Sequence, residues 1–343
     1  MLKIVFSIIG TLIGAGFASG QEIYTFFFKY GANGIIGIVI SSILLSLIIR
    51  KTLLIIKNKK VKNYKMFLDK VLNGKEKRKY LNVKYITNLV INIFILITYY
   101  IMVAGFGAYL KQEIGINNTI GSSVLAILTY FIATSKKDRI LDINKILIPL
   151  LIIFIIFIGI IIIGKEDSTQ QIEKNNIKNI AIVIKTGIVY ASYNAILLIP
   201  FLITVNGDKL KTIEINKISI LSGVIIAILA YIIFMMLRKI NIDISTLEMP
   251  AVYIVGKSGE IFRYIYGFII LASIFTTTIA LQKSFLQNIC KDKKSYTHIV
   301  TIMCITSVVM SKFGFANLVK VLFNLFGYLG IIQIFKILVC KVK

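Results

Sequence analysis

The residues that most clearly suggest binding chemistry are four glycines and one glutamate near the start of the chain. Gly10, Gly14, Gly16 and Gly20 lie in an apolar segment that ends at Glu22. Each glycine in a helix interior costs roughly 0.5–1 kcal/mol relative to alanine, so this spacing predicts close packing by another helix, a break in the helix, or both. A break at the middle glycines frees backbone N–H and C=O groups that bind charged groups.

These free backbone groups predict the chemistry of a ligand. The N–H groups of Ala15, Gly16 and Phe17, beside Ser19, open the second half-helix and favour a carboxylate. The carbonyl groups that close the first half-helix favour a cation or an ammonium group. An α-amino acid carries both charges, so we expect a small-molecule substrate of this kind. The sequence contains no pattern for covalent chemistry, so we expect neither an enzyme nor a cofactor.

A second polar cluster interrupts a later apolar run. It consists of Tyr190, Ser192, Tyr193 and Asn194, and Pro200 follows it. Inside a bilayer, unwound amides must be satisfied by side chains or by a ligand, so this pattern predicts a second interrupted helix. We expect the four polar side chains to form the other wall of the ligand site. The cluster contains no glycine and is the weaker of the two signals.

Glu22 is the acidic side chain inside the first apolar segment, and two roles stay open for it. A buried carboxylate is costly and usually functional, which favours a role in coupling through a cation or a proton. A structural role, in which Glu22 bonds to the sixth helix or to backbone amides, is equally consistent with its position. Lys185 is a candidate partner, although it also fits a lysine that extends to the membrane surface.

The composition places these segments in a membrane. The chain has 343 residues, of which 57% are hydrophobic and 16% charged, and its mean hydropathy is +0.86. Apolar runs of about twenty residues, enough to cross a ~30 Å hydrocarbon layer, recur along the chain. A net charge of +25 indicates nucleic-acid binding in a soluble protein, but basic residues beside membrane helices instead set topology. We therefore expect the lipid bilayer and not nucleic acid as a partner.

The apolar runs predict an all-α integral membrane protein with ten transmembrane helices. The expected helices are 4–29, 34–56, 84–110, 119–134, 140–164, 179–205, 213–237, 258–289, 296–311 and 314–338. The basic loop 57–84 also contains apolar residues, which fits either a short amphipathic helix on lipid or a solvated connector.

Basic residues predict the orientation. In this arrangement 28 Lys and Arg residues fall on the side of the termini and 10 on the other side, which favours a multi-pass protein of the bacterial cytoplasmic membrane with both termini in the cytoplasm. We expect residues 1–343 to form a single transmembrane domain. Because each half has five helices, an odd number, the two halves must be inverted relative to each other. Repeat one then covers 1–165 and repeat two covers 179–340, with helices one and six interrupted.

The stretch Gly14-Ala-Gly-Phe-Ala-Ser-Gly-Gln-Glu22, with the aromatic continuation Tyr24 to Phe28, resembles the YkvI-like family of bacterial membrane proteins. That family looks like a branch of the amino acid–polyamine–organocation superfamily. The resemblance implies the five-plus-five inverted repeat that is often called the leucine-transporter fold. It also implies that Tyr99 or Tyr100 in the third helix contacts the ligand carboxylate, although packing explains either tyrosine equally well.

A second stretch, Ser273 to Ala280, is similar to the hydroxyl-rich part of the eighth helix in sodium-coupled relatives. The resemblance implies Na⁺ as a candidate coupling ion. Its ligands are then the backbone carbonyls of Gly10, Ile13 and Ser273 and the hydroxyls of Thr276 and Thr277. The alternative is that these hydroxyls bond to carbonyls of their own helix.

The resemblance also suggests another way to couple transport. Some proton-coupled relatives place a lysine of the fifth helix where others bind the ion, and Lys145 lies on that helix, although near its cytoplasmic start. The sequence therefore predicts a secondary active transporter that imports an amino acid or a related small amine-bearing solute, coupled to Na⁺ or H⁺. The alternative is a non-transporting nutrient receptor subunit like those of spore germination. No feature of the sequence indicates an oligomeric state.

Overall fold

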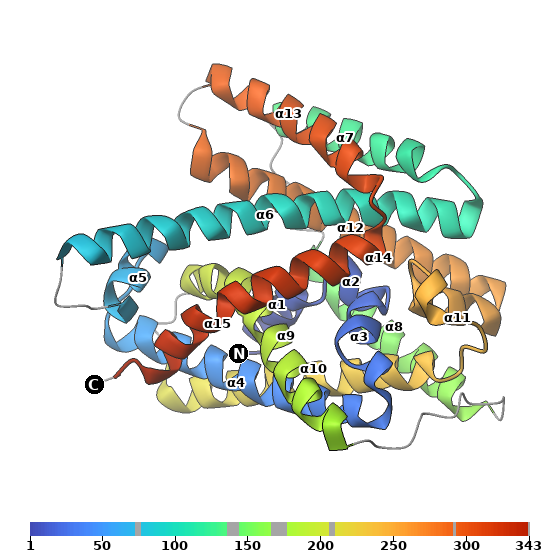
Figure 1. Cartoon of the computed structure of the whole chain (residues 1–343), viewed down its shortest axis with the longest axis horizontal. Helices are drawn as coiled ribbons and strands as arrows, with labels where there is room; N and C mark the ends of the chain where they lie inside the picture. Colours follow the sequence, from blue (N-terminus) through green and yellow to red (C-terminus); the bar gives the residue numbers. More distant parts are fainter. Residues whose placement is uncertain (73–76, 136–143, 166–176, 206–209, 291–292, 342–343) are drawn as a thin grey trace.

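The computed structural model describes the chain except for residues 73–76, 136–143, 166–176, 206–209, 291–292 and 342–343 (Figure 1). The described residues form helices and turns, with no strand among them. The helices of the N-terminal half are α1 (Leu2–Leu12), α2 (Ala15–Ala18), α3 (Gln21–Phe26), η1 (Phe28–Asn33), α4 (Gly34–Asn58), α5 (Tyr64–Leu72), α6 (Lys77–Ile114), α7 (Asn118–Thr134) and α8 (Asn144–Gly164). The C-terminal half contains α9 (Ile177–Thr204), α10 (Thr212–Leu237), η4 (Ile244–Thr246), α11 (Pro250–Ser258), α12 (Glu260–Ile289), α13 (Lys293–Ser311), α14 (Phe315–Leu318), η5 (Val319–Phe323) and α15 (Asn324–Val339).

Most of these helices have the length and composition of membrane spans. Within the described residues, seven helical segments are long and apolar enough to cross a bilayer, and α1, α7 and the 295–311 part of α13 are shorter apolar helices. Lipid-facing positions show the expected pattern, because Ile153 and Ile160, two turns apart on α8, are 67% and 66% exposed. The protein is therefore embedded in a membrane.

Two groups of helices enclose the start of the chain. In one group α6 packs against α7, α12 and α13, and in the other α4 packs against α9 and α10, while α15 covers α9. Helix α1 contacts α8, α9 and α10, whereas α2 contacts α6 and α12. The broken first segment, α1 to α3, therefore lies between the two groups (Figure 1).

The expected interruption of the sixth helix is wrong, because α9 is continuous from Ile177 to Thr204. The Ser192 hydroxyl donates to the carbonyl of Ile188 at 2.6 Å, and the Asn194 amide donates to the carbonyl of Tyr190 at 3.0 Å. These polar side chains bond to carbonyls of their own helix and need no unwound backbone. Pro200 lies in the last turns of α9, inside the helix.

The basic loop after the second span was expected to form either a short amphipathic helix on lipid or a solvated connector. It contains a short helix, α5. Its apolar residues Phe67 and Leu68 are buried, and α5 contacts α6 and α15. The apolar side of α5 is therefore covered by protein and not by lipid. A further helix, α11, precedes α12 and was not expected from the sequence.

Helices α9 and α15 pack with their backbones in close contact. A Cβ atom added to Gly330 would lie 2.6 Å from the carbonyl oxygen of Ser192, and one added to Gly327 would lie 2.6 Å from that of Val189. Real Cβ atoms do not approach backbone this closely, so the α9–α15 contact requires glycine at both positions.

Replacing Gly330 with alanine therefore tests the α9–α15 contact. We expect the Gly330→Ala protein to lose about 1–3 kcal/mol of stability, because the backbone of α9 cannot move away as a side chain can. The matched control is Gly164→Ala, where an added Cβ meets no atom within 4 Å. Thermal unfolding in detergent measures both, and equal transition temperatures for the two variants would contradict this packing.

Candidate functional site

The first membrane segment breaks at Ile13 and Gly14, as the glycine pattern predicts. Helix α1 ends at Leu12, Gly14 is extended with φ −90° and ψ −172°, and α2 begins at Ala15. No side chain caps the start of α2, so its first N–H groups have no helical or side-chain acceptor there. The break therefore presents carbonyl groups from α1 and N–H groups from α2 inside the bundle.

A second interruption follows one turn later and was not predicted. Gly20 has φ +81°, a left-handed conformation that favours glycine, and separates α2 from α3. The freed carbonyl of Ala18 accepts a hydrogen bond from the Tyr266 hydroxyl at 2.6 Å, and that of Ser19 accepts one from the N–H of Ala251 at 2.8 Å. Helices α12 and α11 thus satisfy the backbone that this interruption exposes.

The carboxyl group of Glu22 folds back from α3 to the break. A Cβ added to Gly16 would overlap this carboxyl group, so the absence of a side chain at Gly16 makes room for it. The Tyr193 hydroxyl of α9 donates a hydrogen bond to Glu22 Oε2, and the Tyr190 hydroxyl also contacts the carboxyl group. Gly16, Glu22, Tyr190 and Tyr193 therefore meet at one point between the first segment and α9.

Glu22 is only 4% exposed, and no cation pairs with it among the described residues. Lys185, the candidate partner, is exposed on α9 and its Nζ lies 5.1 Å from the centre of the Tyr328 ring. Its position fits the alternative of a lysine that extends to the membrane surface. Hydroxyl groups, which carry no charge, therefore satisfy the Glu22 carboxyl group.

Aromatic rings surround Tyr193 at the same point. Its ring stacks on Phe323 with centroids 4.6 Å apart, and the centroids of Phe26 and Phe94 lie 5.5 and 6.5 Å away. Phe323 ends the π-helix η5, a rare element that often occurs at functional sites. The sequence analysis missed Phe94 and Phe323, because an aromatic residue in an apolar helix carries no signal of its own.

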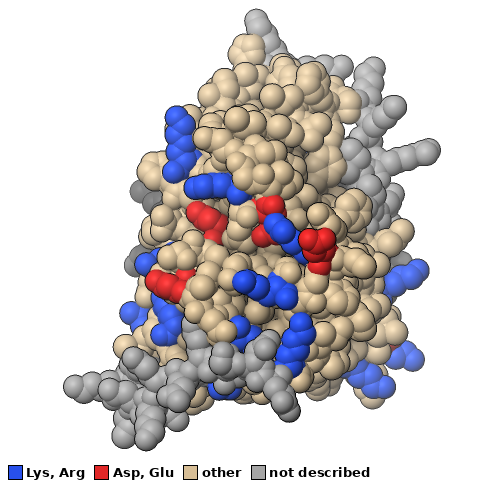
Figure 2. Space-filling view, turned by 90° about the vertical axis from the view of Figure 1, so that its right-hand side faces the viewer, with Lys and Arg blue, Asp and Glu red and all other residues tan. Residues whose placement is uncertain are grey.

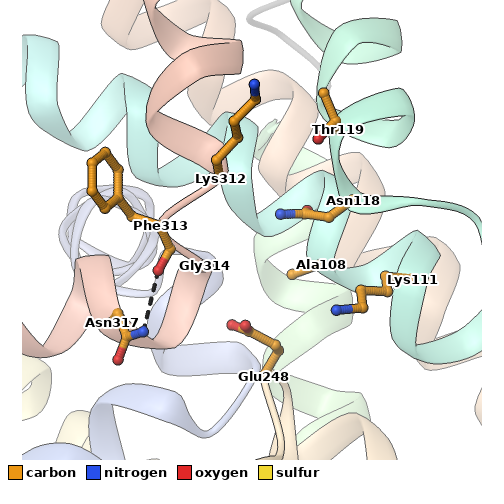
Figure 3. A pocket seen from close by; sticks show the side chains of 9 residues that line it. All are labelled: Ala108, Lys111, Asn118, Thr119, Glu248, Lys312, Phe313, Gly314 and Asn317. Atoms are coloured by element: carbon orange, nitrogen blue, oxygen red, sulfur yellow. Dashed lines mark hydrogen bonds between the residues drawn. The ribbon is translucent and has the colours of Figure 1, made fainter.

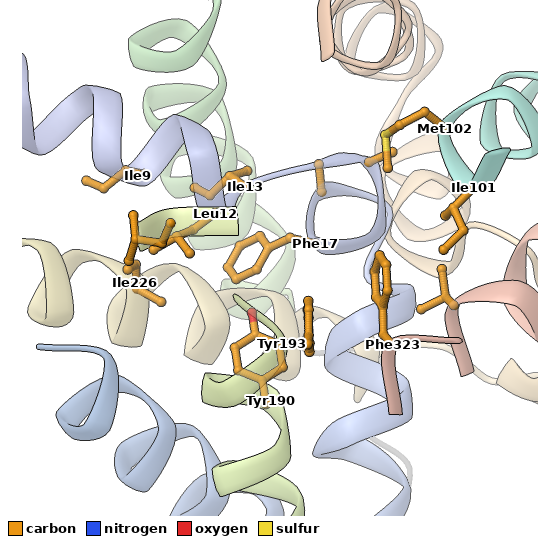
Figure 4. Close-up of a cluster of buried hydrophobic side chains, with 14 of the residues drawn as sticks. Ile9, Leu12, Ile13, Phe17, Ile101, Met102, Tyr190, Tyr193, Ile226 and Phe323 are labelled. Carbon is orange, nitrogen blue, oxygen red and sulfur yellow. The ribbon is translucent and has the colours of Figure 1, made fainter. Parts of the chain in front are cut away.

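Side chains from three elements cover the break. Figure 4 shows Phe17 of α2, Met102 of α6 and Tyr193 of α9 around it, with Phe323 beside them. Phe17 is 1% exposed and Met102 is 2% exposed. These apolar side chains shield most of the backbone at the break, where Ile13 and Ala15 are buried and Gly14 is half-buried.

The two tyrosines predicted on the third helix bond to α7 and α13, and a contact of either one with the ligand carboxylate stays a prediction. The Tyr99 hydroxyl lies 3.3 Å from that of Thr129 and 3.5 Å from Cys304 Sγ, on α7 and α13. The Tyr100 hydroxyl bonds to that of Thr306 on α13 at 2.8 Å. Both hydroxyl groups join α6 to its neighbours, and the sequence did not reveal these partners.

The remaining predicted ligand residues hold local structure. The Ser19 hydroxyl donates to the carbonyl of Gly16 at 3.1 Å and accepts the N–H of Gln21 at 3.3 Å. Ser192 lies at the α9–α15 contact, and the Asn194 amide bonds to the carbonyl of Tyr190. Ala15, Gly16 and Phe17 lie at the break as expected, and a ligand-binding role for all of these residues stays a prediction.

The residues predicted to hold Na⁺ lie on α1 and α12. The Thr276 hydroxyl donates to the carbonyls of Ala272 and Ser273, at 2.9 and 3.1 Å, which is the alternative of bonding within its own helix. Gly10 faces α8, where an added Cβ would overlap Ile148. Ile13 lies at the break, while Ser273 and Thr277 are half-buried.

Periodicity places two of these residues on the face of α12 that also contacts α2. Ser273 and Thr277 share a face of α12 with Tyr266, which bonds to Ala18. Lys145 is the second residue of α8, and its side chain lies outside the described part of the structure. Sodium binding and a coupling role for Lys145 both stay predictions.

A cavity of about 450 Å³ lies apart from the break, at the end of the molecule that holds the C-terminus of α6. Its lining residues are Ala108, Lys111, Asn118, Thr119, Glu248, Lys312, Phe313, Gly314 and Asn317. Figure 3 shows Lys111 and Glu248 pointing into it from different elements. Glu248 Oε2 accepts the N–H of Ala316 at 2.7 Å, so this carboxylate also holds the start of α14.

Charged residues of both signs gather at this end of the molecule (Figure 2). Arg263 and Glu113 form an ion pair with 2.5 Å between Nε and Oε2. The Gln112 amide bonds to both the N–H and the carbonyl of Met249, which ties the start of α11 to α6.

Comparison with known proteins supports a membrane role. The chain is 26% identical to the uncharacterized membrane protein YkvI of Bacillus subtilis, over 99% of this chain and 95% of that protein. It is 27% identical to the uncharacterized protein YyaD of the same organism, over 96% and 94% of the two chains. No protein-family model matches the chain.

Among solved structures, the fold is similar to that of MhsT crystallised in complex with L-phenylalanine. The TM-score is 0.66 at 16% sequence identity, and the match covers 97% of this chain and 88% of MhsT. The chain is thus homologous to the membrane protein YkvI and to YyaD of Bacillus subtilis, and it shares the fold of MhsT.

Proposed function

We propose that the protein is a secondary active transporter for an amino acid or a related small amine-bearing solute, which it imports by alternating access. The observation that carries the proposal is the break at Ile13 and Gly14, buried between two helix groups and faced by Glu22 and Tyr193. An irregular backbone is tolerated at membrane depth where it lines a binding site or is buried in protein.

The backbone at the break supports an amino acid as the substrate. The uncapped N–H groups at the start of α2 carry the positive end of its dipole and suit a carboxylate. The carbonyl groups that end α1 suit an ammonium group. The fold shared with MhsT, a protein crystallised with L-phenylalanine, adds support without identifying the side chain that is recognised.

The proposed architecture has ten spans in two inverted halves of five, with both termini in the cytoplasm. The seven long and three shorter apolar helices among the described residues support that number. The excess of Lys and Arg on the side of the termini supports the orientation. Transport of the solute is coupled to a gradient either of Na⁺, which would bind at the residues of α1 and α12 predicted for it, or of H⁺.

A thermal-shift screen of the purified protein tests the proposal. We expect one or more of the common L-amino acids to raise the unfolding temperature, because a ligand that binds the folded state stabilises it by mass action. The screen is repeated with Na⁺ replaced by K⁺ or choline. Stabilisation that requires Na⁺ supports the sodium site, and stabilisation in every salt eliminates it.

The same screen has a result that contradicts the proposal. If no amino acid at millimolar concentration changes the unfolding temperature in any of the salts, the protein does not bind this class of solute. The panel also includes small amines that lack a carboxylate, because the break is expected to recognise the ammonium group as well as the carboxylate.

A substitution at Gly16 tests the position of the binding site. A Cβ at Gly16 would overlap the Glu22 carboxyl group. We expect Gly16→Ala to weaken binding of the stabilising amino acid by about tenfold or more, since such overpacking costs roughly 1–3 kcal/mol. Gly164→Ala, where an added Cβ meets no atom within 4 Å, is the control, and equal affinities of the two variants would place the site elsewhere.

A further inference from the structure

Glu22 and the proposed carboxylate subsite occupy the same corner of the break. The N–H groups of Ala15, Gly16 and Phe17 open α2, and the Glu22 carboxyl group lies directly beside Gly16. The following inference rests on the proposed function, because it concerns an amino acid bound at this point. Two ionised carboxylates this close, both buried, repel each other strongly because water does not screen them.

The charged groups around Glu22 offer no cation to relieve that repulsion. The elements packed against α3 are α2, η1, α9, α10 and η5. Within the described residues, the hydroxyl groups of Tyr190 and Tyr193 face the carboxyl group. The titratable side chains that lie elsewhere on α3 and these elements are Tyr24, Lys29, Tyr30, Lys178, Lys185, Glu214, Lys217, Tyr231 and Lys320.

Three lysines on the elements that contact α3 lie in surroundings other than those of Glu22. Lys29, Lys185 and Lys320 are exposed, and the first two lie over the rings of Tyr30 and Tyr328. Arg238, just after α10, extends toward Met235 Sδ at 4.0 Å. The described surroundings of Glu22 therefore leave a proton as the positive charge that neutralises its carboxylate.

We propose that Glu22 carries the coupling proton and that an amino acid binds at the break only when Glu22 is protonated. Proton and solute then cross together. The proton comes from water on the side where the site is open and converts the carboxylate to the carboxylic acid. It returns to water on the other side after the solute leaves.

The hydrogen bond to Tyr193 fits both states of Glu22. An ionised carboxylate only accepts hydrogen bonds, and the Tyr193 hydroxyl supplies one. A protonated Glu22 also donates, so its O–H can bond to the carboxylate of an amino acid held by the α2 N–H groups. Protonation thus turns a repelling group into a ligand of the solute.

The test measures binding of the twenty common L-amino acids to the full-length protein between pH 5 and pH 9, by thermal shift and by titration calorimetry. For the wild type we expect affinity to fall about tenfold per pH unit above the pH at which Glu22 loses its proton. For Glu22→Gln, which cannot ionise, we expect affinity that does not change with pH. Glu214→Gln, at the start of α10, is the matched control and should behave like the wild type.

A second measurement needs no variant. Adding the bound amino acid to wild-type protein in weakly buffered solution at alkaline pH should withdraw a proton from solution with each molecule bound, as a pH indicator reports. Glu22→Gln should take up none. Binding to the wild type without proton uptake overturns the proposal even if the variant fails to fold.

The outcomes separate this inference from the function on which it rests. If the wild type and Glu22→Gln bind the amino acid with the same pH dependence, the role of Glu22 as the proton carrier is overturned. The proposal of amino acid transport is then unaffected. Loss of binding in a folded Glu22→Gln protein, with tight wild-type binding at high pH, also overturns it and makes the carboxylate a ligand of the solute ammonium group. Failure of all twenty amino acids to bind the wild type at any pH contradicts the proposed function itself.

Discussion

Backbone groups that lose their helical partners inside a bilayer must find others, and this constraint shapes the centre of the molecule. Helix α1 ends at Leu12 and α2 starts after Gly14, so the first segment exposes carbonyl and N–H groups where water is scarce. The second interruption at Gly20 is satisfied by Tyr266 and by the N–H of Ala251. The first break has no such side-chain cap, which is why we assign the ligand to it.

The same hydrogen bonds describe what must change when the site opens. The α2–α3 half-segment is attached to α9 through Glu22 and Tyr193, to α12 through Ala18 and to α11 through Ser19. A motion that gives access to the break separates α2–α3 from at least one of these helices. In the mechanism that we propose, protonation of Glu22 acts on the attachment to α9, so that binding and motion share one group.

The sequence predicted the helical class and the first break well, because apolar length and glycine spacing are local properties. It did not reveal contacts that depend on distant partners. The hydroxyl groups of Tyr99 and Tyr100 bond to residues of α7 and α13, which no spacing on α6 predicts. The polar cluster on α9 did not unwind the helix, because Ser192 and Asn194 find acceptors on α9 itself. The contact between Glu22 and Gly16 spans the interruption at Gly20, and no helical spacing describes it.

Accumulation of solute by proteoliposomes that contain only this protein tests the central claim most directly. The amino acid that stabilises the protein is supplied outside in labelled form, with an inward gradient of H⁺ or of Na⁺. The account predicts accumulation above the external concentration that collapses when the driving gradient is dissipated. Binding without accumulation under either gradient, in vesicles of both orientations, would contradict it and indicate a receptor that senses the solute without moving it.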